Sequence, residues 1–347
     1  MDTIATLKSV TNPKSIHGMY PYRGKISAIE AASIVGSFSH ETKLLDPFCG
    51  SGTIVYEAKK SGLAEAWGTD LNPLAQWLTE AKLQCPVDLI DAQSELEYVL
   101  TQNAVSPLVK NDRLLFYFHE QTLREIESVS QVFDQFSPYL KGCFAGALAL
   151  SARGCNGYRW TSSTVGKSLE EKIYIPFFEK FAAKIKKHHY PVSDKGAYRF
   201  VQQDARSLSK TFSPGYFDTV FTSPPYFDAL DYTAYYAKIL YLLLGVDSVE
   251  VKPTLIQKTS TYEEDMRQVL EELVKVTSDR ARLIFVVGDK KTKSGVINGG
   301  EFFSELLRHK PDKVFERVYT GSSSQIFDEI NRTSRREQIV VWDKSKW

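Results

Sequence analysis

Two short stretches of this chain combine residue types that could hold a ligand and do chemistry on it. The first, residues 46–53, has the sequence DPFCGSGT, and its glycines Gly50 and Gly52 permit a sharp turn that lets the backbone approach a ligand closely. The second, residues 222–226, has the sequence TSPPY. Its consecutive prolines fix the backbone and remove two N–H donors, which leaves carbonyl groups free to accept hydrogen bonds from an NH2 group. Tyr226 adds an aromatic face on which a flat ring could stack.

Neither of two familiar phosphate-binding loops explains the first stretch, which we term the glycine turn. A dinucleotide fingerprint would need a third glycine where Val55 stands, and a phosphate loop would have to end in Gly-Lys-Ser or Gly-Lys-Thr. The chain does contain Gly-Lys-Ser at 166–168, but Thr161 occupies the position where that motif requires glycine. The glycine turn therefore predicts a different kind of ligand.

Two aspartates are placed to bind such a ligand. Asp70 follows a predicted strand at 64–69, where an acid can accept two hydrogen bonds from the hydroxyl groups of a ribose. Asp204 follows a predicted strand at 199–203 in a comparable position. For both residues the alternative is an ordinary aspartate that caps a helix or stabilises a turn.

The elements that must position these residues follow from the apolar pattern. The predicted strands are 43–45, 64–69, 199–203, 217–222 and 282–287, with 314–319 and 338–342 as a terminal hairpin-like pair. The predicted helices are 26–38, 54–60, 114–136, 144–152 and 175–188. Asp46, Asp70, Asp204 and Ser223 then each fall at the carboxyl end of a strand. Open parallel sheets bind their ligands at that edge, so the pattern predicts an α/β fold with one site there.

Composition and charge favour a globular enzyme but do not identify a partner. The 347 residues are 43% hydrophobic and 24% charged, and the net charge is +1. The chain has no apolar run of about 18 residues and no signal-peptide pattern at its N-terminus, so we expect neither a membrane span nor export. The four cysteines show no metal-ligand spacing, so we expect a reduced, cytoplasmic protein without a metal.

The glycine turn and the TSPPY stretch, which we term the proline turn, together resemble motifs of the amino-group DNA methyltransferases. That family methylates cytosine N4 or adenine N6 and is found with restriction-modification systems. Residues 15–25, with the sequence SIHGMYPYRGK, resemble the segment that closes over the methionine end of the cofactor in this family, and we term them the closing segment. The order of the motifs resembles the SPPY subgroup, whose recognition region lies between the two halves of the core. The resemblance covers residues 15–83 and 198–342.

This resemblance implies a class I S-adenosylmethionine-dependent methyltransferase fold, which is an α/β, Rossmann-like mixed sheet with an inserted, mainly helical subdomain. Residues 1–84 would hold the closing segment and the cofactor-binding half of the core, and residues 197–347 the catalytic half. Roughly 110 residues separate the second and third predicted strands, far more than a helical crossover needs. Residues 85–196 are therefore predicted to form the insertion, with target recognition as its role.

The resemblance also implies roles for single residues. The cofactor S-adenosylmethionine would be bound by His17, Tyr20, Asp46, Pro47, Phe48, Gly50, Gly52, Thr53, Asp70, Leu71, Asn72, Asp204 and Ala205. The catalytic residues would be Ser223, Pro224, Pro225 and Tyr226. Ser223 favours cytosine N4, because adenine-N6 members usually carry Asp or Asn at this position. Adenine N6 is the alternative target.

The partner implied by the family is double-stranded DNA, with a cognate restriction endonuclease as a further partner. Candidate DNA contacts lie in and near a glycine-containing loop and are Arg153, Asn156, Arg159, Trp160 and Lys167. The alternative for them is an ordinary surface loop. Two other classes stay open: an RNA or protein-amine methyltransferase, because related proline motifs serve guanine-N2 and glutamine substrates, and a binding subunit without catalytic activity.

Overall fold

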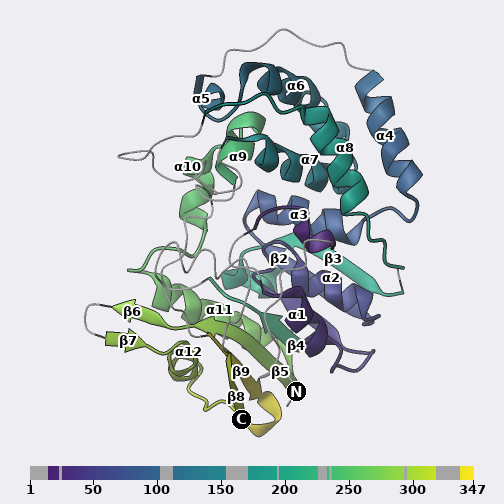
Figure 1. Cartoon of the computed structure of the whole chain (residues 1–347). Coiled ribbons are helices and arrows are strands. Elements are labelled where there is room, and N and C mark those ends of the chain that lie inside the picture. Colours follow the sequence, from purple (N-terminus) through teal and green to yellow (C-terminus); the bar gives the residue numbers. More distant parts are fainter. Residues whose placement is uncertain are drawn as a thin grey trace.

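The computed structural model describes the chain in several ranges and places seven strands in one sheet (Figure 1). The described residues are 15–22, 26–101, 112–153, 171–193, 195–225, 233, 237–292, 295–317 and 337–347. The strands of the sheet are β1 (Lys43–Asp46), β2 (Glu65–Asp70), β3 (Ala197–Gln202), β4 (Phe217–Thr222), β5 (Thr277–Gly288), β8 (Lys313–Arg317) and β9 (Glu337–Asp343). Across the sheet they follow the order β3-β2-β1-β4-β5-β9-β8.

The order and direction of the strands identify the fold class of this sheet. The neighbours from β3 to β5 all pair in parallel, whereas β9 runs antiparallel to both β5 and β8. This is the Rossmann-like sheet of the class I S-adenosylmethionine-dependent methyltransferases, as the sequence predicts. The terminal pair predicted at 314–319 and 338–342 is confirmed as β8 and β9. A separate antiparallel pair, β6 (Lys290–Thr292) and β7 (Gly295–Ile297), follows β5.

Helices cover both faces of the sheet (Figure 1). The described α-helices are α1 (Ala28–Val35), α2 (Thr53–Lys60), α3 (Pro73–Leu83), α4 (Leu89–Thr101), α5 (Asp112–Leu115), α6 (Glu120–Ser130), α7 (Pro138–Ser151), α8 (Phe177–Lys187), α9 (Lys238–Leu244), α10 (Ser248–Val251), α11 (Tyr262–Val276) and α12 (Gly299–Leu307). Because side chains alternate along a strand, Leu45 and Leu283 pack with α11 and α12, whereas Leu44 and Ile284 pack with α1 and α2. Within the described part of the chain, no helix has the length and apolar character of a membrane span.

Several predicted boundaries differ from those observed, among them the helix predicted at 144–152, which is α7 and begins at Pro138, and two of the differences have local reasons. Strand β5 begins at Thr277 rather than at Arg282, because exposed charged side chains interrupt the apolar pattern near its start. The helix predicted over 114–136 is broken between α5 and α6. The break occurs at His119, whose side chain caps α6 by accepting a hydrogen bond from the Gln121 N–H at 3.2 Å. A local cap therefore outweighs the continuous apolar pattern.

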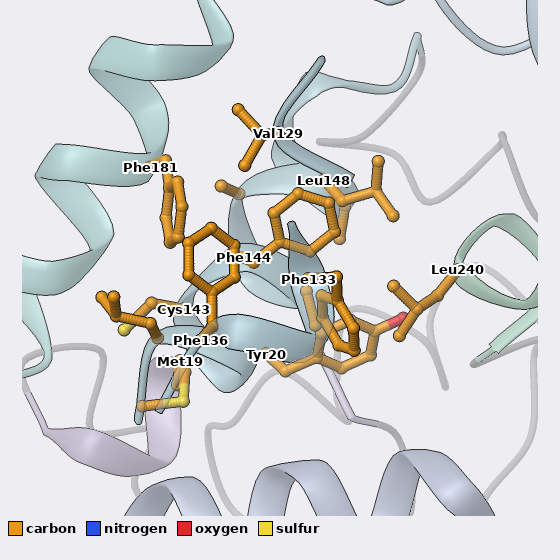
Figure 2. Packing of buried hydrophobic residues seen from close by; sticks show 14 of the residues in the cluster. Met19, Tyr20, Val129, Phe133, Phe136, Cys143, Phe144, Leu148, Phe181 and Leu240 are labelled. Carbon is orange, nitrogen blue, oxygen red and sulfur yellow. The ribbon is translucent and has the colours of Figure 1, made fainter. Parts of the chain in front are cut away.

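Helices α4 to α9 form a region with an apolar cluster of its own (Figure 1). This cluster extends beyond residues 85–196. Figure 2 shows Met19 and Tyr20 of the closing segment, and Leu240 of α9, among the phenylalanine rings of the cluster. The helical region therefore shares its core with the closing segment and with a helix that follows the proline turn.

A close backbone contact joins the closing segment to the helical region. A side-chain carbon at Gly146, on α7, would lie 2.0 Å from the carbonyl oxygen of Met19, so that position requires glycine. The Lys184 ammonium of α8 donates hydrogen bonds to the carbonyl oxygens of Met19, at 2.8 Å, and of Gly18, at 3.2 Å. Two helices of the region thus hold the backbone of the closing segment.

We expect Gly146→Ala to lower the free energy of unfolding by about 1–3 kcal/mol, because the added carbon forces α7 and the closing segment apart. The gain in helix propensity, about 1 kcal/mol, would act in the opposite direction. Urea unfolding measures the net change. Leu150→Ala, at a position of the same helix that is 38% exposed, is the control and should change stability by about 1 kcal/mol or less. An unchanged or increased stability for Gly146→Ala would contradict the close contact.

Candidate active site

A cavity lies at the carboxyl edge of the parallel strands, where the sequence predicts a site. It opens to solvent, and the empty space within it, part of which is open solvent, is about 860 Å³. The predicted cofactor-binding residues that line it are Asp46, Pro47, Phe48, Gly50, Thr53, Asp70, Leu71, Asn72, Asp204 and Ala205. Ser223 and Pro225 of the proline turn line the same cavity. The fold thus brings the glycine turn, the acids and the proline turn to one place.

Both glycines of the glycine turn adopt backbone angles that favour glycine. Gly52 has a φ of 71° and serves as the N-cap of α2, and a side-chain carbon there would lie 2.6 Å from Oγ1 of Thr79. Gly50 has a φ of 49°, and its side-chain carbon would lie 3.2 Å from the Tyr22 hydroxyl. Gly52 does not line the cavity but shapes the turn that does.

Asp46 links the glycine turn to the proline turn. It ends β1, and its Oδ1 accepts a hydrogen bond of 2.7 Å from the hydroxyl of Thr222, which ends β4. The Phe48 N–H donates to the same oxygen at 3.3 Å. Burial raises the pKa of this carboxyl to about 7, while the Thr222 hydrogen bond acts in the opposite direction.

Asp70 ties the end of β2 to the glycine turn. Its Oδ2 accepts a hydrogen bond from the Gly50 N–H at 3.0 Å, and its Oδ1 accepts one from the Asn72 N–H at 2.9 Å. Burial raises the pKa of Asp70 to about 6. Each carboxylate oxygen can accept more than one hydrogen bond, so Asp70 retains capacity to accept hydrogen bonds from a ligand.

Asn72 offers a donor at the cavity wall. It is 2% exposed and caps α3, where its Oδ1 accepts hydrogen bonds from the Leu74 N–H at 3.0 Å and from the Tyr241 hydroxyl at 2.5 Å. Its Nδ2 has no hydrogen-bond partner among the described residues. Because a buried donor left without a partner costs free energy, this amide fits a site that a polar ligand completes.

Asp204 ends the segment that follows β3 and is held by a neighbouring arginine. Its Oδ1 accepts the Arg206 backbone N–H at 2.9 Å, and its two oxygens accept Nε and Nη2 of the Arg206 side chain. Leu255 and Ile256, which precede α11, also line the cavity and add apolar surface. The cavity therefore combines carboxylate acceptors with apolar walls, as a nucleoside requires.

The proline turn is fixed from behind by α11. The hydroxyl of the buried Tyr262 donates to the Pro225 carbonyl oxygen at 2.5 Å. Pro224 is buried and does not line the cavity, whereas Ser223 is half-buried and does. Tyr226 lies outside the described residues.

The closing segment contributes Tyr22 to the cavity wall, and not the predicted His17 or Tyr20. His17 lies behind the glycine turn, where its Nε2 is 2.8 Å from Glu57 Oε1 and its Nδ1 is 3.3 Å from Lys82 Nζ. Lys82 also donates to the Ser51 carbonyl. Tyr20 and Tyr22 both belong to the apolar cluster of the helical region, but Tyr22 also lines the cavity and Tyr20 does not.

Other lining residues were not anticipated from the sequence. They are Tyr22, Ile26, Cys49, Ser51, Ile54, Gln203, Leu255 and Ile256. Cys49, Ser51 and Ile54 adjoin motif positions and could have been inferred from them. Leu255 and Ile256 belong to no motif, and nothing local in the sequence indicates their role.

One of the candidate DNA contacts lies within the described residues. Arg153 follows α7, and its guanidinium carbon lies 4.1 Å from the centre of the Phe116 ring. Asn156, Arg159, Trp160 and Lys167 lie outside the described residues. Among the residues that the structure describes, no group of three His, Cys, Asp or Glu side chains could hold a metal ion.

The chain is similar to known methyltransferases over most of its length, although no family model matches it. It is 26% identical to Type II methyltransferase M.MvaI of Kocuria varians, across 86% of this chain and 72% of that protein. It is 21% identical to Type II methyltransferase M.MjaII of Methanocaldococcus jannaschii, across 85% and 77% respectively. Among solved structures, the rRNA methyltransferase aviRa of Streptomyces viridochromogenes matches at 12% identity over 99% of this chain and 94% of that one, with a TM-score of 0.34. The sequence relatives and the fold support an S-adenosylmethionine-dependent methyltransferase.

We expect Thr222→Val to destabilise the protein more at about pH 8 than at about pH 6. Burial raises the pKa of Asp46 from 3.8, its ordinary value, to about 7 in the folded protein. The folded protein therefore has its full stability from this group below pH 3.8, and it loses that stability as the pH rises through about 7 and the buried carboxyl ionises. Removing the Thr222 donor costs more when the carboxylate is charged, about 1.5–3 kcal/mol against about 0.5–1.5 kcal/mol when it is protonated. Urea unfolding at both pH values measures the two losses.

Thr219→Val is the matched control, since Thr219 lies on the same strand, is equally buried and does not bond to Asp46. Its effect should be independent of pH over this range. Equal losses at both pH values for Thr222→Val would contradict the role assigned to the hydrogen bond.

Proposed function

We propose that this protein is a DNA methyltransferase that moves a methyl group from S-adenosylmethionine to the exocyclic N4 of a flipped cytosine. The observation that carries the proposal is that one cavity is lined by the glycine turn, by Asp70 and by the proline turn. The relatives named Type II methyltransferase support a DNA methyltransferase, and Ser223 favours cytosine over adenine.

The cavity offers a partner for each part of the cofactor's nucleoside. The Asp70 carboxylate accepts hydrogen bonds from the ribose hydroxyls, and the Asn72 amide supplies a donor beside it. Asp204 accepts the adenine amino group, while Phe48 and Ile256 provide apolar surface for the ring. When bound, the cofactor supplies an electrophilic methyl group on a sulfonium.

The proline turn holds the nitrogen that receives the methyl group. The exocyclic amine of a base is a weak nucleophile, because its lone pair is delocalised into the ring. The Ser223 hydroxyl, at the cavity wall, accepts one of its two N–H groups and favours a pyramidal nitrogen, while the Pro224 carbonyl and Tyr226 would take the acceptor and stacking roles that the family resemblance implies. Alignment and electrostatics then supply the rate, without a covalent intermediate on the protein. Flipping the base out of the duplex costs a few kcal/mol, which stacking in the pocket offsets.

Mass spectrometry of nucleosides from DNA treated with the protein and cofactor tests this proposal. We expect 4-methylcytosine. Detection of 6-methyladenine would establish the alternative target, and methylation of RNA or protein with unmodified DNA would contradict the proposal. Binding of the cofactor without methylation of any of these substrates would favour a binding subunit.

We expect Ser223→Ala to reduce methyl transfer on the order of a hundredfold or more, because it removes an acceptor that orients the amine. Cofactor affinity should stay close to that of the unchanged protein, since Ser223 faces the base and not the nucleoside of the cofactor. Transfer rates and calorimetry separate the two effects. Ser128→Ala, on α6, removes a hydroxyl that does not line the cavity and should change neither. Parallel loss of affinity and rate in Ser223→Ala would contradict the assignment.

We expect cofactor affinity to fall as the pH drops through about 6, because the Asp70 carboxylate, whose pKa burial raises to about 6, must be ionised to accept both ribose hydroxyls. Asp70→Asn should bind more weakly near neutral pH, on the order of tenfold, and should lose this pH dependence. Calorimetry across the range measures both. The exposed Asp279, replaced by Asn, should keep the original profile. If Asp70→Asn kept the pH dependence of cofactor affinity that the unchanged protein shows, Asp70 would not be the residue that binds the ribose.

A further inference from the structure

Arg206 makes contacts that no sequence motif predicts. It lies two residues after Asp204, in the 3-10 helix Ala205–Lys210. Its Nε is 3.0 Å from Oδ1 of Asp204 and its Nη2 is 2.8 Å from Oδ2, so the guanidinium holds both oxygens of that carboxylate in a fork. A carboxylate held at both oxygens keeps one orientation.

The same guanidinium reaches two further segments. Its Nη1 donates to Oδ1 of Asp265 in α11 at 2.7 Å, and its Nη2 donates to the Thr254 carbonyl oxygen at 2.8 Å. Thr254 directly precedes Leu255 and Ile256, which line the cavity. One side chain thus joins the acid and the apolar wall on one side of the cavity to α11.

The charges and the partial burial of these groups suit ion pairs that hold one geometry. The side chains of Arg206, Asp204 and Asp265 are 22%, 29% and 16% exposed, so solvent screens the ion pairs only in part. The hydrogen bond to Asp204 raises the pKa of Arg206, which therefore stays charged at every working pH.

We propose that Arg206 is a positioning residue of the subsite that recognises the adenine ring of the cofactor. It orients the Asp204 carboxylate toward the 6-amino group and sets Leu255 and Ile256 against the ring. The inference rests on the proposed function, in which Asp204 accepts that amino group. It adds that selectivity for a 6-aminopurine depends on a residue that does not touch the purine.

Lysine cannot replace Arg206 in this role. A guanidinium presents several donors in a fixed plane, whereas an ammonium is a compact point charge on a flexible stem. Arg206→Lys therefore keeps the charge but cannot hold both Asp204 oxygens, Asp265 and the Thr254 carbonyl together. The substitution therefore distinguishes the effect of the hydrogen-bond geometry at this position from the effect of its positive charge.

The test compares two ligands on the full chain by calorimetry: S-adenosylhomocysteine, and its analogue with hydrogen in place of the 6-amino group. The unchanged protein should prefer the amino ligand by about tenfold or more, as expected of a hydrogen bond to a carboxylate. In Arg206→Lys the amino ligand should lose about tenfold in affinity while the analogue changes by less than about threefold, so the preference disappears. A general loss of stability would weaken both ligands alike.

Two matched variants complete the test. Arg267→Lys alters an arginine of α11 that pairs with Glu263 and Glu264 and does not line the cavity, and it should keep the preference. Asp265→Ala keeps the Asp204 fork, removes the acceptor for Nη1 of Arg206 and should reduce the preference in part. This variant also covers the case in which Arg206→Lys does not fold, since a full preference in Asp265→Ala would then overturn the inference.

The outcomes separate the inference from the function on which it rests. A preference retained in Arg206→Lys, or an equal loss for both ligands, overturns the role of Arg206 and leaves the proposed function standing. A protein that binds neither ligand contradicts the proposed function and the inference with it.

Discussion

The hydrogen bond from Thr222 to Asp46 joins the carboxyl ends of the two central strands of the sheet. The glycine turn begins at one end of this bond and the proline turn begins at the other. Because both groups are buried, water cannot replace either partner without cost. This constraint fixes the distance between the glycine turn and the proline turn, and the proposed direct methyl transfer would depend on that distance.

A second set of contacts fixes the same two loops from the side of α11. The first turns of this helix provide the Tyr262 hydroxyl, which binds the Pro225 carbonyl, and the Asp265 carboxylate, which binds Arg206. Arg206 in turn holds Asp204. The helix therefore holds groups of the proline turn and, through Arg206, the Asp204 side of the cavity, so a shift of α11 would move both together.

The closing segment is held in a similar way by residues far from it in sequence. Lys184 binds its backbone carbonyls, and Gly146 permits the close approach of α7. His17 adds a buried contact with Glu57, whose pKa burial raises. The helical region thus has a structural role next to the cavity, in addition to the target recognition that the family resemblance implies.

The sequence by itself determined the strands, the glycine turn and the acids at strand ends. These features depend on neighbouring residues: a short run of β-branched and aromatic residues marks β4, a positive φ requires glycine at Gly52, and Asn72 caps the helix that begins next to it. The same local logic explains why the terminal antiparallel pair could be predicted.

Tertiary structure alone decided which side chains complete the cavity. Tyr22, rather than His17 or Tyr20, lines it: Glu57 and Lys82 engage His17, and Tyr20 packs with Tyr22 in the cluster of the helical region without lining the cavity. The residues that support the site, among them Arg206, Tyr241 and Tyr262, act across long separations in the sequence. No local periodicity or turn preference encodes such contacts, because they depend on how whole helices pack against the sheet.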